Sequence, residues 1–210
     1  MTDEYSFLQM ARDYHHGDLP TALRAAAVEL IAERGPAGFS LREVARRAGV
    51  SHAAPAHHFG DTRGLLTAVA TEGFELLAEA MAAAIEDGRS ARDRLARCGQ
   101  AYVHTALANP GHYQVMVTHE YTDPDDPALI TASLRAYELL LETVGQLRDE
   151  YDPDLDVDTT ASLLWCNVHG IVEISPVFDR VADLTDTNSS SVDELVERLT
   201  GLVIDGIRPR

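Results

Sequence analysis

The chain has 210 residues, 45% of them hydrophobic, and a formal net charge of −17 at pH 7. This length suffices for one large or two modest domains, with a core that needs no disulfide or metal. No run of 18 apolar residues occurs, and no apolar signal segment follows the acidic N-terminus, so we expect a soluble, cytoplasmic protein without membrane partners.

Charge is distributed unevenly along the chain. All 17 basic residues are arginine. Residues 1–73 contain seven arginines and nine acidic residues, whereas residues 74–210 contain ten arginines and 25 acidic residues. Because an acidic surface repels phosphate, we expect nucleic-acid contact only in the first part and a different role for the second.

The first predicted helix begins near Asp18, a suitable cap, and ends at about Arg34, ahead of Gly35-Pro36. Its apolar residues recur at the three- and four-residue spacing of one buried helix face. They are Leu23, Ala26, Ala27, Leu30 and Ile31.

Residues 40–59 predict a helix-turn-helix. Ser40 and Glu43 form a capping box that starts a first short helix. Gly49 suits the positive φ just past its end, and Ser51 is expected to cap a second short helix. In such a motif the second helix lies in the DNA major groove and presents its N-terminal residues to base edges.

Residues 34–63 carry a local excess of positive charge. Five arginines stand against two acidic residues, which gives +3 in a chain of net charge −17. A local basic patch is what phosphate contact requires. The alternative is an ordinary helical hairpin inside a bundle. The charged residues are Arg34, Arg42, Arg46, Arg47 and Arg63, with Glu43 and Asp61.

The rest of the chain shows helical periodicity and no sustained alternation, so we predict an all-α fold. A long helix is expected to join the helix-turn-helix to a C-terminal helical part. The predicted elements are a helix from Asp61 or Thr62 to about Ile85, helices over about 91–108, 112–119, 128–150, 159–175 and 192–207, and loops over 121–127 and 183–191. The helix over 159–175 is expected to end ahead of Pro176.

The helix over 159–175 is apolar on more than one face, so one face is available to a partner. Together with the last helix it predicts a four-helix contact between two copies of the chain. Burial in the middle of a monomer is the alternative. The candidate interface residues are Leu163, Gly170, Ile171, Ile174, Leu195, Leu199 and Leu202.

Aromatic, histidine and methionine side chains of the second part are candidates for a ligand pocket. Trp165 and His169 are one helical turn apart and therefore face the same side. Such a lining suits a small, largely apolar ligand, and simple filling of the core is the alternative. The candidates are Tyr102, His104, Tyr113, Met116, Tyr121, Tyr137, Trp165 and His169.

No catalytic, cofactor or metal site is predicted. The chain has no G-x-S-x-G, G-x-G-x-x-G or Walker sequence, and neither C-x-x-C nor H-E-x-x-H occurs among its nine histidines and two cysteines. Cys98 and Cys166 lie in apolar helical patterns, so we expect both to be buried, unpaired thiols.

From Tyr14 to about Leu77 the sequence resembles the tetracycline-repressor-like (TetR) family of bacterial transcription regulators. The resemblance includes the Tyr-His-His-Gly-Asp-Leu segment at 14–19, the helix-turn-helix, and Phe59 followed by Asp61 and Leu65-Leu66. The Trp165-x-x-x-His169-Gly170 sequence resembles the WHG subgroup of that family.

This resemblance implies an all-helical homodimer with a DNA-binding domain over residues 14–64, preceded by an arm over 1–13. It also implies an effector-binding and dimerisation domain over residues 65–210. The protein would then be a transcriptional regulator, by default a repressor that a small molecule releases from a palindromic operator. Activation of transcription is the alternative.

The residues expected to contact DNA lie at the N-termini of the helices and on the second helix of the motif. Serine hydroxyls and arginines can contact phosphate, and histidines can contact bases or phosphate. Histidine protonates near pH 6.5, so mildly acidic pH should strengthen these contacts. The candidates are Ser40, Arg42, Ser51, His52, Ala53, His57, His58, Thr62 and Arg63.

Three positions depart from the family pattern. Ala56 stands where the family commonly has tyrosine, and Thr62 where it commonly has lysine; both usual residues contact phosphate. Pro55 removes a backbone donor near the start of the second helix. An alternative function is therefore an all-helical small-molecule-binding or scaffold protein whose helix-turn-helix no longer binds DNA.

Overall fold

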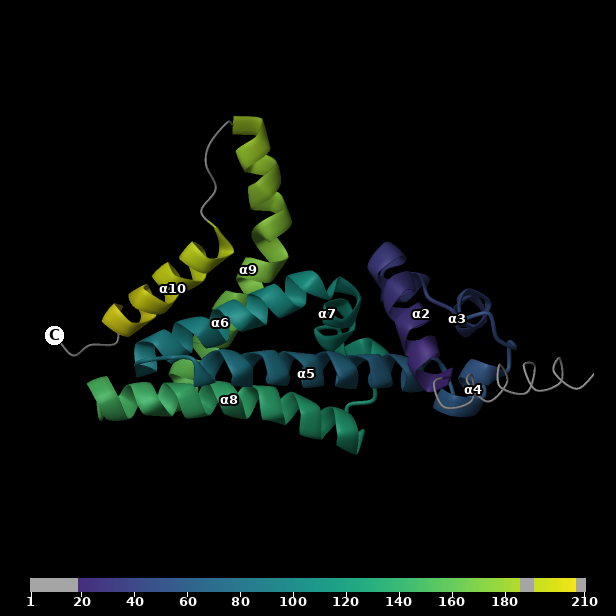
Figure 1. Cartoon of the computed structure of the whole chain (residues 1–210), viewed down its shortest axis with the longest axis horizontal. Coiled ribbons are helices and arrows are strands. Elements are labelled where there is room, and N and C mark those ends of the chain that lie inside the picture. The colour runs from purple at the N-terminus through teal and green to yellow at the C-terminus, as the bar shows by residue number, and fades with distance from the viewer. Residues whose placement is uncertain (1–18, 186–190, 207–210) are drawn as a thin grey trace, which may run out of the picture. The chain divides into compact units, whose positions relative to one another are not determined.

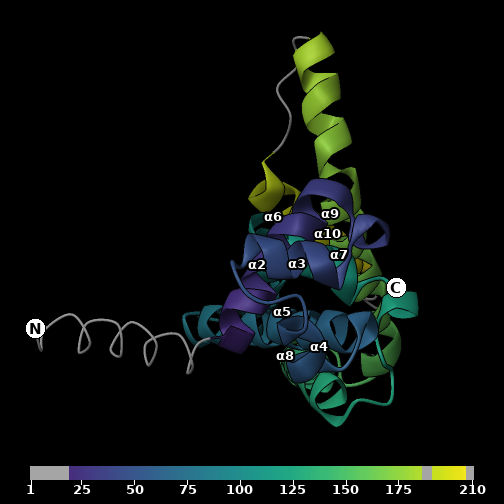
Figure 2. The ribbon, with the colours of Figure 1, turned by 90° about the vertical axis from the view of Figure 1, so that its right-hand side faces the viewer.

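The computed structural model describes residues 19–185 and 191–206, and every regular element in these ranges is a helix, which confirms the all-α class. Asp18, the arm over 1–13, the segment over 14–18 and residues 186–190 of the predicted loop lie outside the described residues. Figures 1 and 2 give the course of the chain. The elements are α2 (Leu19–Arg34), η1 (Pro36–Gly38), α3 (Leu41–Arg47), α4 (Ala54–Phe59), α5 (Thr62–Glu86), α6 (Ala91–Ala108), α7 (Pro110–Met116), η2 (His119–Tyr121), α8 (Pro127–Tyr151), α9 (Val157–Thr185) and α10 (Val192–Gly206).

The helices group into two compact units. The first consists of the residues up to Gly73 and of Pro110–Leu129, and the second of Phe74–Asn109 and the residues from Ile130 onward. The division therefore falls within α5, after Gly73, and not at the predicted residue 64. It also places α7 with the N-terminal helices.

In the first unit α2 contacts α3, α4 and α7. The five apolar residues predicted for the buried face of α2 are all buried, and Leu65, Leu66 and Val69 of α5 are buried as well. Thr67 of α5 is 4% exposed; its hydroxyl donates to the Arg63 carbonyl at 2.8 Å and accepts from the Asp123 backbone N–H at 2.9 Å. This bond attaches the segment after α7 to α5.

The contact between α2 and α7 is close because α7 carries a glycine there. A Cβ on Gly111 would lie 2.3 Å from the Val28 carbonyl oxygen, so no other residue fits without a shift of backbone. The helix α7 is thus packed against α2, the helix that precedes the helix-turn-helix.

In the second unit α6, α9 and α10 contact one another. Ser90 caps α6 by accepting from the Asp93 backbone N–H, and the Glu150 carboxylate at the end of α8 accepts from the Ala91 backbone N–H at 2.9 Å. In both Figure 1 and Figure 2 the C-terminal half of α9 stands clear of the other helices of this unit.

Three sequence predictions about local structure were wrong. The α9 helix continues through Pro176, which is exposed, to Thr185. Cys98 is buried as expected, but Cys166 is exposed. Ser51 does not cap the second helix of the motif, since α4 begins at Ala54 and no side chain caps it.

Candidate nucleic-acid interface and ligand cavity

The helix-turn-helix consists of α3, a tight turn and α4. Ser40 accepts from the Glu43 backbone N–H at 3.3 Å, which confirms half of the predicted capping box. Gly49 has φ 69°, as the turn requires, and the Val50 N–H returns to the Ala45 carbonyl at 3.0 Å. Asp61 accepts from the Gly64 N–H at 2.9 Å and so caps α5, the first helix after the motif.

All nine residues predicted to contact DNA are exposed: Ser40, Arg42, Ser51, His52, Ala53, His57, His58, Thr62 and Arg63. Pro55, by contrast, is buried in the first turn of α4 and fills space in the domain. Its missing N–H costs little there, because the first turn of a helix leaves its N–H groups unpaired in any case. The departure at Pro55 is therefore compatible with an intact second helix.

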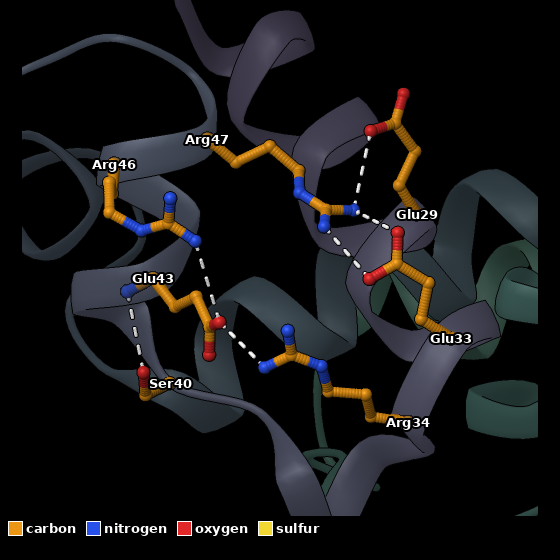
Figure 3. Close-up of polar contacts among 7 residues, drawn as sticks. All are labelled: Glu29, Glu33, Arg34, Ser40, Glu43, Arg46 and Arg47. Carbon is orange, nitrogen blue, oxygen red and sulfur yellow. Dashed lines mark hydrogen bonds and ion pairs between the residues drawn. The ribbon is translucent and has the colours of Figure 1, made fainter.

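Three of the five arginines counted as a basic patch are held by carboxylates of the same unit, as Figure 3 shows. Arg47 donates from its two terminal nitrogens to the two oxygens of Glu33, both at 2.8 Å, and lies 3.5 Å from Glu29. Arg34 donates to Glu43 at 2.6 Å, and Arg46 lies 3.7 Å from the same oxygen. The contacts of Arg47 and Arg34 join α2 to α3, whereas the contact of Arg46 lies within α3.

The hydrogen bonds to Arg47 are the main reason that the pKa of Glu33 lies below its usual value, and they also raise the pKa of Arg47. The paired, bidentate geometry fixes Arg47 more firmly than a single contact would. Arg47 therefore connects α3 to α2, and its side chain is only 23% exposed.

The predicted charge of +3 over residues 34–63 overstates the charge available to a ligand. With Glu29 and Glu33 included, residues 29–63 hold five arginines against four carboxylates, a net charge of +1. Arg42 and Arg63 have no ion pair within the described residues, and Arg46 is 68% exposed beside its more distant carboxylate. These three side chains carry the fixed positive charge of this surface.

Three exposed histidines add polar ring nitrogens to the surface of the helix-turn-helix. His57 and His58 are neighbours on α4, with ring centroids 5.3 Å apart in an edge-to-face arrangement, and His52 is exposed in the turn before α4. No carboxylate within the described part of the chain forms an ion pair with any of the three. The surface of α4 can therefore offer ring nitrogens as donors or acceptors to an approaching polar ligand.

Four rings from α6, α8 and α9 form an aromatic cluster in the second unit: Tyr102, Tyr137, Trp165 and His169. The Trp165 ring centroid lies 5.3 Å from that of Tyr102, 5.7 Å from Tyr137 and 5.2 Å from His169. The prediction that Trp165 and His169 face the same side is confirmed.

Hydrogen bonds define the state of His169. Its Nδ1 lies 2.9 Å from the Trp165 carbonyl oxygen, which can only accept, so Nδ1 carries the hydrogen. Nε2 then accepts from the Tyr102 hydroxyl at 3.1 Å. Burial is the main cause that lowers the pKa of His169, in keeping with a neutral ring.

An apolar cavity of about 30 Å³ lies beside this cluster. Its walls include Met81, Cys98, Tyr102, Leu164 and Trp165. A space of this size holds one or two water molecules and is far below the 300 Å³ or so of a usual ligand pocket. A ligand would have to enlarge it.

The other predicted pocket residues lie elsewhere. His104 is exposed on α6, and its Nε2 lies 2.6 Å from the Asp193 carboxylate of α10, so it does not line the cavity. Tyr113, Met116 and Tyr121 belong to the first unit. Sequence spacing could not separate them from the cluster, because the unit that α7 joins depends on tertiary contacts.

Part of the predicted interface face is exposed. Leu163 is 50%, Ile174 44% and Leu202 69% exposed, and Gly170 is open to solvent. Leu195 and Leu199 are half-buried. Ile171, however, is buried within its own unit and does not belong to this face.

Sequence reasoning missed several residues of both sites. Glu29 and Glu33 were not connected with the helix-turn-helix, although their four-residue spacing puts them on one face of α2. Met81, Cys98 and Leu164 line the cavity but looked like ordinary core residues. No local signal distinguishes a cavity wall from a filled core.

Within the described ranges, no cluster of three or more histidine, cysteine, aspartate or glutamate side chains is placed to hold a metal ion. Nor does any helix there combine the length and the apolar composition that a bilayer crossing demands.

Two protein-family models match the chain. Residues 23–69 match "Bacterial regulatory proteins, tetR family", and residues 95–200, more than half of the chain, match "Tetracyclin repressor-like, C-terminal domain". The first match contains α3 and α4, and the second contains most of the aromatic cluster's helices. A search of curated proteins found no match.

Solved structures share the fold over nearly the whole chain. A protein of unknown function from Rhodococcus sp. RHA1 is 32% identical, with a TM-score of 0.76 over 92% of this chain and 97% of that one. FadR from Bacillus subtilis, solved with stearoyl-CoA, is 17% identical, with a TM-score of 0.67 over 90% and 99%. AibR, solved with isovaleryl coenzyme A and operator DNA, is 18% identical, with a TM-score of 0.65 over 87% and 96%.

The last two likenesses concern the fold alone, whereas the family models cover the helix-turn-helix and most of the second unit. The chain therefore belongs to the tetR family of bacterial regulatory proteins, DNA-binding transcriptional regulators that are not enzymes.

Proposed function

We propose that this regulator is a homodimeric repressor that binds a palindromic operator and is released from it by a small, largely apolar effector. The observation that carries the proposal is the pairing of an exposed helix-turn-helix surface with an aromatic cluster and apolar cavity in the other unit. The first suits DNA, and the second suits an apolar ligand.

On the DNA side, Ser40 and Arg42 at the start of α3 and Thr62 and Arg63 at the start of α5 are proposed to contact phosphate. All four are exposed. Helix N-termini add backbone N–H groups to such contacts. His52, Ala53, His57 and His58 are proposed to face the bases. Because Arg34 and Arg47 are held by carboxylates, specificity would depend on base contacts more than on phosphate anchoring.

The dimer is proposed to form through α9 and α10. Leu163, Gly170 and Ile174 are seven and four residues apart, which is about two turns and one turn and places them on one side of α9. All three are exposed, and Leu202 is exposed on α10. Exposed apolar side chains on adjoining helices favour self-association, and two-fold symmetry makes such a patch self-complementary. A two-fold dimer then presents two recognition helices to half-sites roughly 34–36 Å apart.

Acyl-CoA thioesters are the effectors to test first. FadR and AibR, which share the fold, were solved with stearoyl-CoA and isovaleryl coenzyme A respectively. An acyl chain suits the apolar walls formed by Met81, Leu164 and Trp165. The bound thioester is a ligand here, and no chemical step acts on it.

The small cavity suggests how an effector would act. At about 30 Å³ it excludes an acyl chain, so a bound chain requires a conformation in which the walls have moved apart. An effector shifts an equilibrium only by its difference in affinity for the two conformations. A ligand that fits only the conformation with the enlarged cavity has a much higher affinity for that conformation. Such a ligand releases DNA if that conformation binds the operator weakly.

The test is a mobility-shift titration with DNA flanking the gene, without effector and with decanoyl-CoA. We expect a shifted band of a palindromic site at low salt, and its loss when decanoyl-CoA is added. Protection of two half-sites one helical turn apart would support a dimer. A band that persists at saturating ligand would contradict effector release, and so would a band that forms only when the ligand is present.

A further inference from the structure

A second, larger hollow lies in the same unit, between the N-terminal half of α6 and the middle of α10. It is an open groove of about 380 Å³. Its lining is polar and includes Arg92, Arg97 and Gln100 from α6 and Glu197 and Thr200 from α10. The proposed function leaves this groove without a role.

The groove lies at a concentration of positive charge in an acidic part of the chain. Residues 89–97 contain four arginines and one acidic residue, whereas the remainder of residues 74–210 contains six arginines and 24 acidic residues. The arginines are Arg89, Arg92, Arg94 and Arg97. Of these, Arg92 and Arg97 line the groove together with the carboxylates Asp93 and Glu197, whereas Arg94 donates to Gln146 and the Gly88 carbonyl. The groove can therefore bind an anion only through guanidinium donors that these carboxylates leave free.

Arg92 is seated in the groove by a glycine. A Cβ on Gly201 of α10 would lie 2.8 Å from the Arg92 Nη2, so the guanidinium occupies the space that a side chain would fill. Glycine within a helix costs about 1 kcal/mol relative to alanine, which indicates a packing reason for it. The guanidinium's acidic neighbour, Asp205, is 3.9 Å away and 59% exposed, so this ion pair is loose.

Arg97 also has hydrogen-bond donors without a partner within the described residues. Only its Nε contacts Asp93, at 3.1 Å, and its two terminal nitrogens have no hydrogen bond to any residue in the described ranges. Asp93 in turn accepts from the Arg89 backbone N–H at 2.9 Å, which lowers the Asp93 pKa and holds its carboxylate at the start of α6. Two guanidinium groups therefore remain able to bind an incoming anion.

The groove and the apolar cavity meet at Thr200. This residue lines both, although it is only 4% exposed. One α10 residue thus separates a charged groove from the space beside Cys98 and Trp165. A single ligand with an anionic end and an apolar end would fit the two together.

We propose that the groove binds the anionic head group of an amphipathic effector, with phosphate oxygens between Arg92 and Arg97 and the apolar chain directed past Thr200 into the cavity. This inference rests on the proposed function for the apolar half of the ligand. Glu197 repels a bare anion but accepts hydrogen bonds, so the groove favours a head group that carries hydroxyl or amide N–H donors beside its charge. An acyl chain on a phosphorylated, amide-containing carrier meets these conditions better than a free fatty acid.

The head-group site is tested alone with inorganic pyrophosphate, titrated calorimetrically into the full-length protein. We expect weak binding that Arg92→Gln reduces about tenfold and that Glu197→Gln strengthens, because the first loses a charge-assisted contact and the second a repulsion. Arg198→Gln is the matched control, since Arg198 lies on α10 with a 72% exposed side chain paired to Glu194 and does not line the groove. Pyrophosphate that does not bind the native protein, or binds Arg92→Gln equally well, overturns the proposal.

The complete ligand is tested through Trp165, the one tryptophan of the chain, which lies at the cavity wall. Decanoyl-CoA should change its fluorescence at lower concentration than decanoate, and Arg92→Gln should raise the concentration needed for decanoyl-CoA about tenfold while leaving decanoate unaffected. Equal loss for both ligands would overturn a head-group role. If neither ligand changes the fluorescence or operator binding, while pyrophosphate still depends on Arg92, the proposed effector function fails and the anion site stands.

Discussion

His112 shows at the scale of a single residue how burial can make the first unit sensitive to pH. It is 8% exposed on α7, and neither ring nitrogen has a hydrogen-bond partner among the described residues. Burial is the main cause that lowers its pKa, and the nearby Glu72, which pairs with Arg24 at 2.7 Å, opposes this in part. The folded state therefore holds His112 neutral more strongly than the unfolded chain does.

Lower pH should for this reason destabilise the first unit. The unfolded chain takes up the His112 proton near pH 6.5, whereas the folded state does so only at lower pH, so stability is complete above pH 6.5 and falls as the pH decreases below it. His112→Leu, which has similar volume, should raise stability by about 1 kcal/mol at pH 7.5 and by more at pH 5.5. Thermal unfolding at both pH values measures the difference. His119→Gln, at an exposed histidine, should change neither value.

Separate residues of the DNA surface should have separable effects. Arg42→Ala should weaken binding to operator and random DNA alike and reduce the slope of log K against log salt by about 1, because it removes a phosphate contact. His57→Ala should instead reduce discrimination between operator and random DNA, by roughly 1–3 kcal/mol for a base contact. Fluorescence anisotropy over a salt series distinguishes the two. Arg135→Ala, at an exposed site in the second unit, is the control; a uniform loss in all three variants would contradict this division of roles.

Helices pack in this protein through a few close contacts that fix their positions, and the pair α2 and α7 is the clearest case. The Cβ position of Gly111 lies 2.3 Å from the Val28 carbonyl oxygen, and that backbone atom cannot turn aside as a side chain would. A second pair of helices, α2 and α3, is held together by the ion pair between Arg47 and Glu33. The contact of Gly111 with Val28 depends on the absence of a side chain, whereas the stability gained from the Arg47–Glu33 pair depends on ionic strength.

Gly111→Ala should therefore destabilise the protein by about 1–3 kcal/mol, because the added methyl group forces the backbones of α2 and α7 apart. Gly145→Ala in α8 is the matched control: a Cβ there meets nothing within 4 Å, and replacing a helical glycine should stabilise by about 0.5–1 kcal/mol. Urea unfolding gives both values. Equal effects of the two substitutions would contradict the close approach.

The Arg47–Glu33 pair should stabilise the helix-turn-helix only at low salt. Glu33→Gln and Arg47→Gln should each lower the melting temperature by a small amount in 50 mM NaCl, and the double variant by less than the sum of the two. In 1 M NaCl the Debye length is about 3 Å, and the differences should shrink. Glu75→Gln, at an exposed carboxylate of α5, should show no such dependence on salt. Additive losses at both salt concentrations would indicate that the pair contributes no coupling.

Local signals predicted most elements well, and tertiary contacts explain the failures. The helix over 91–108 was predicted at its observed bounds, and Asn109-Pro110 marks its end within the sequence. The pairing of Trp165 with His169 followed from one helical turn. In contrast, the continuation of α9 through Pro176, the start of α4 at Ala54 and the burial of Ile171 depend on what lies around each residue. Charge counting failed likewise, since the carboxylates that hold Arg47 come from another helix.

At the scale of the whole molecule, the proposed dimer can be tested through a cysteine on α9. Cys166 is exposed on the same helix as Leu163 and Gly170, whereas Cys98 is buried and burial raises the pKa of its thiol to about 12. A buried thiol with so high a pKa does not react readily with thiol reagents. The chain therefore carries one reactive probe on the face that is proposed to meet its partner.

A short bismaleimide should cross-link two chains through Cys166. We expect a covalent dimer on a denaturing gel, retained in Cys98→Ser and absent in Cys166→Ser, because only Cys166 is exposed. Ile174→Glu should abolish both the cross-link and the dimer seen by light scattering, since it buries a charge in an apolar contact. A dimer in solution that never cross-links through Cys166 would show that another face mediates it.

The two arginines held by carboxylates, Arg34 and Arg47, also bear on how such a regulator would find its operator. A bacterial chromosome offers on the order of 10⁶ or more competing sites, and the time spent on them grows with the number of phosphate contacts. Arg34 and Arg47 are occupied by Glu43 and Glu33, so they add nothing to that non-specific attachment. Fewer molecules would then be held along the chromosome at any moment, and a small number of copies per cell would suffice to keep one operator occupied.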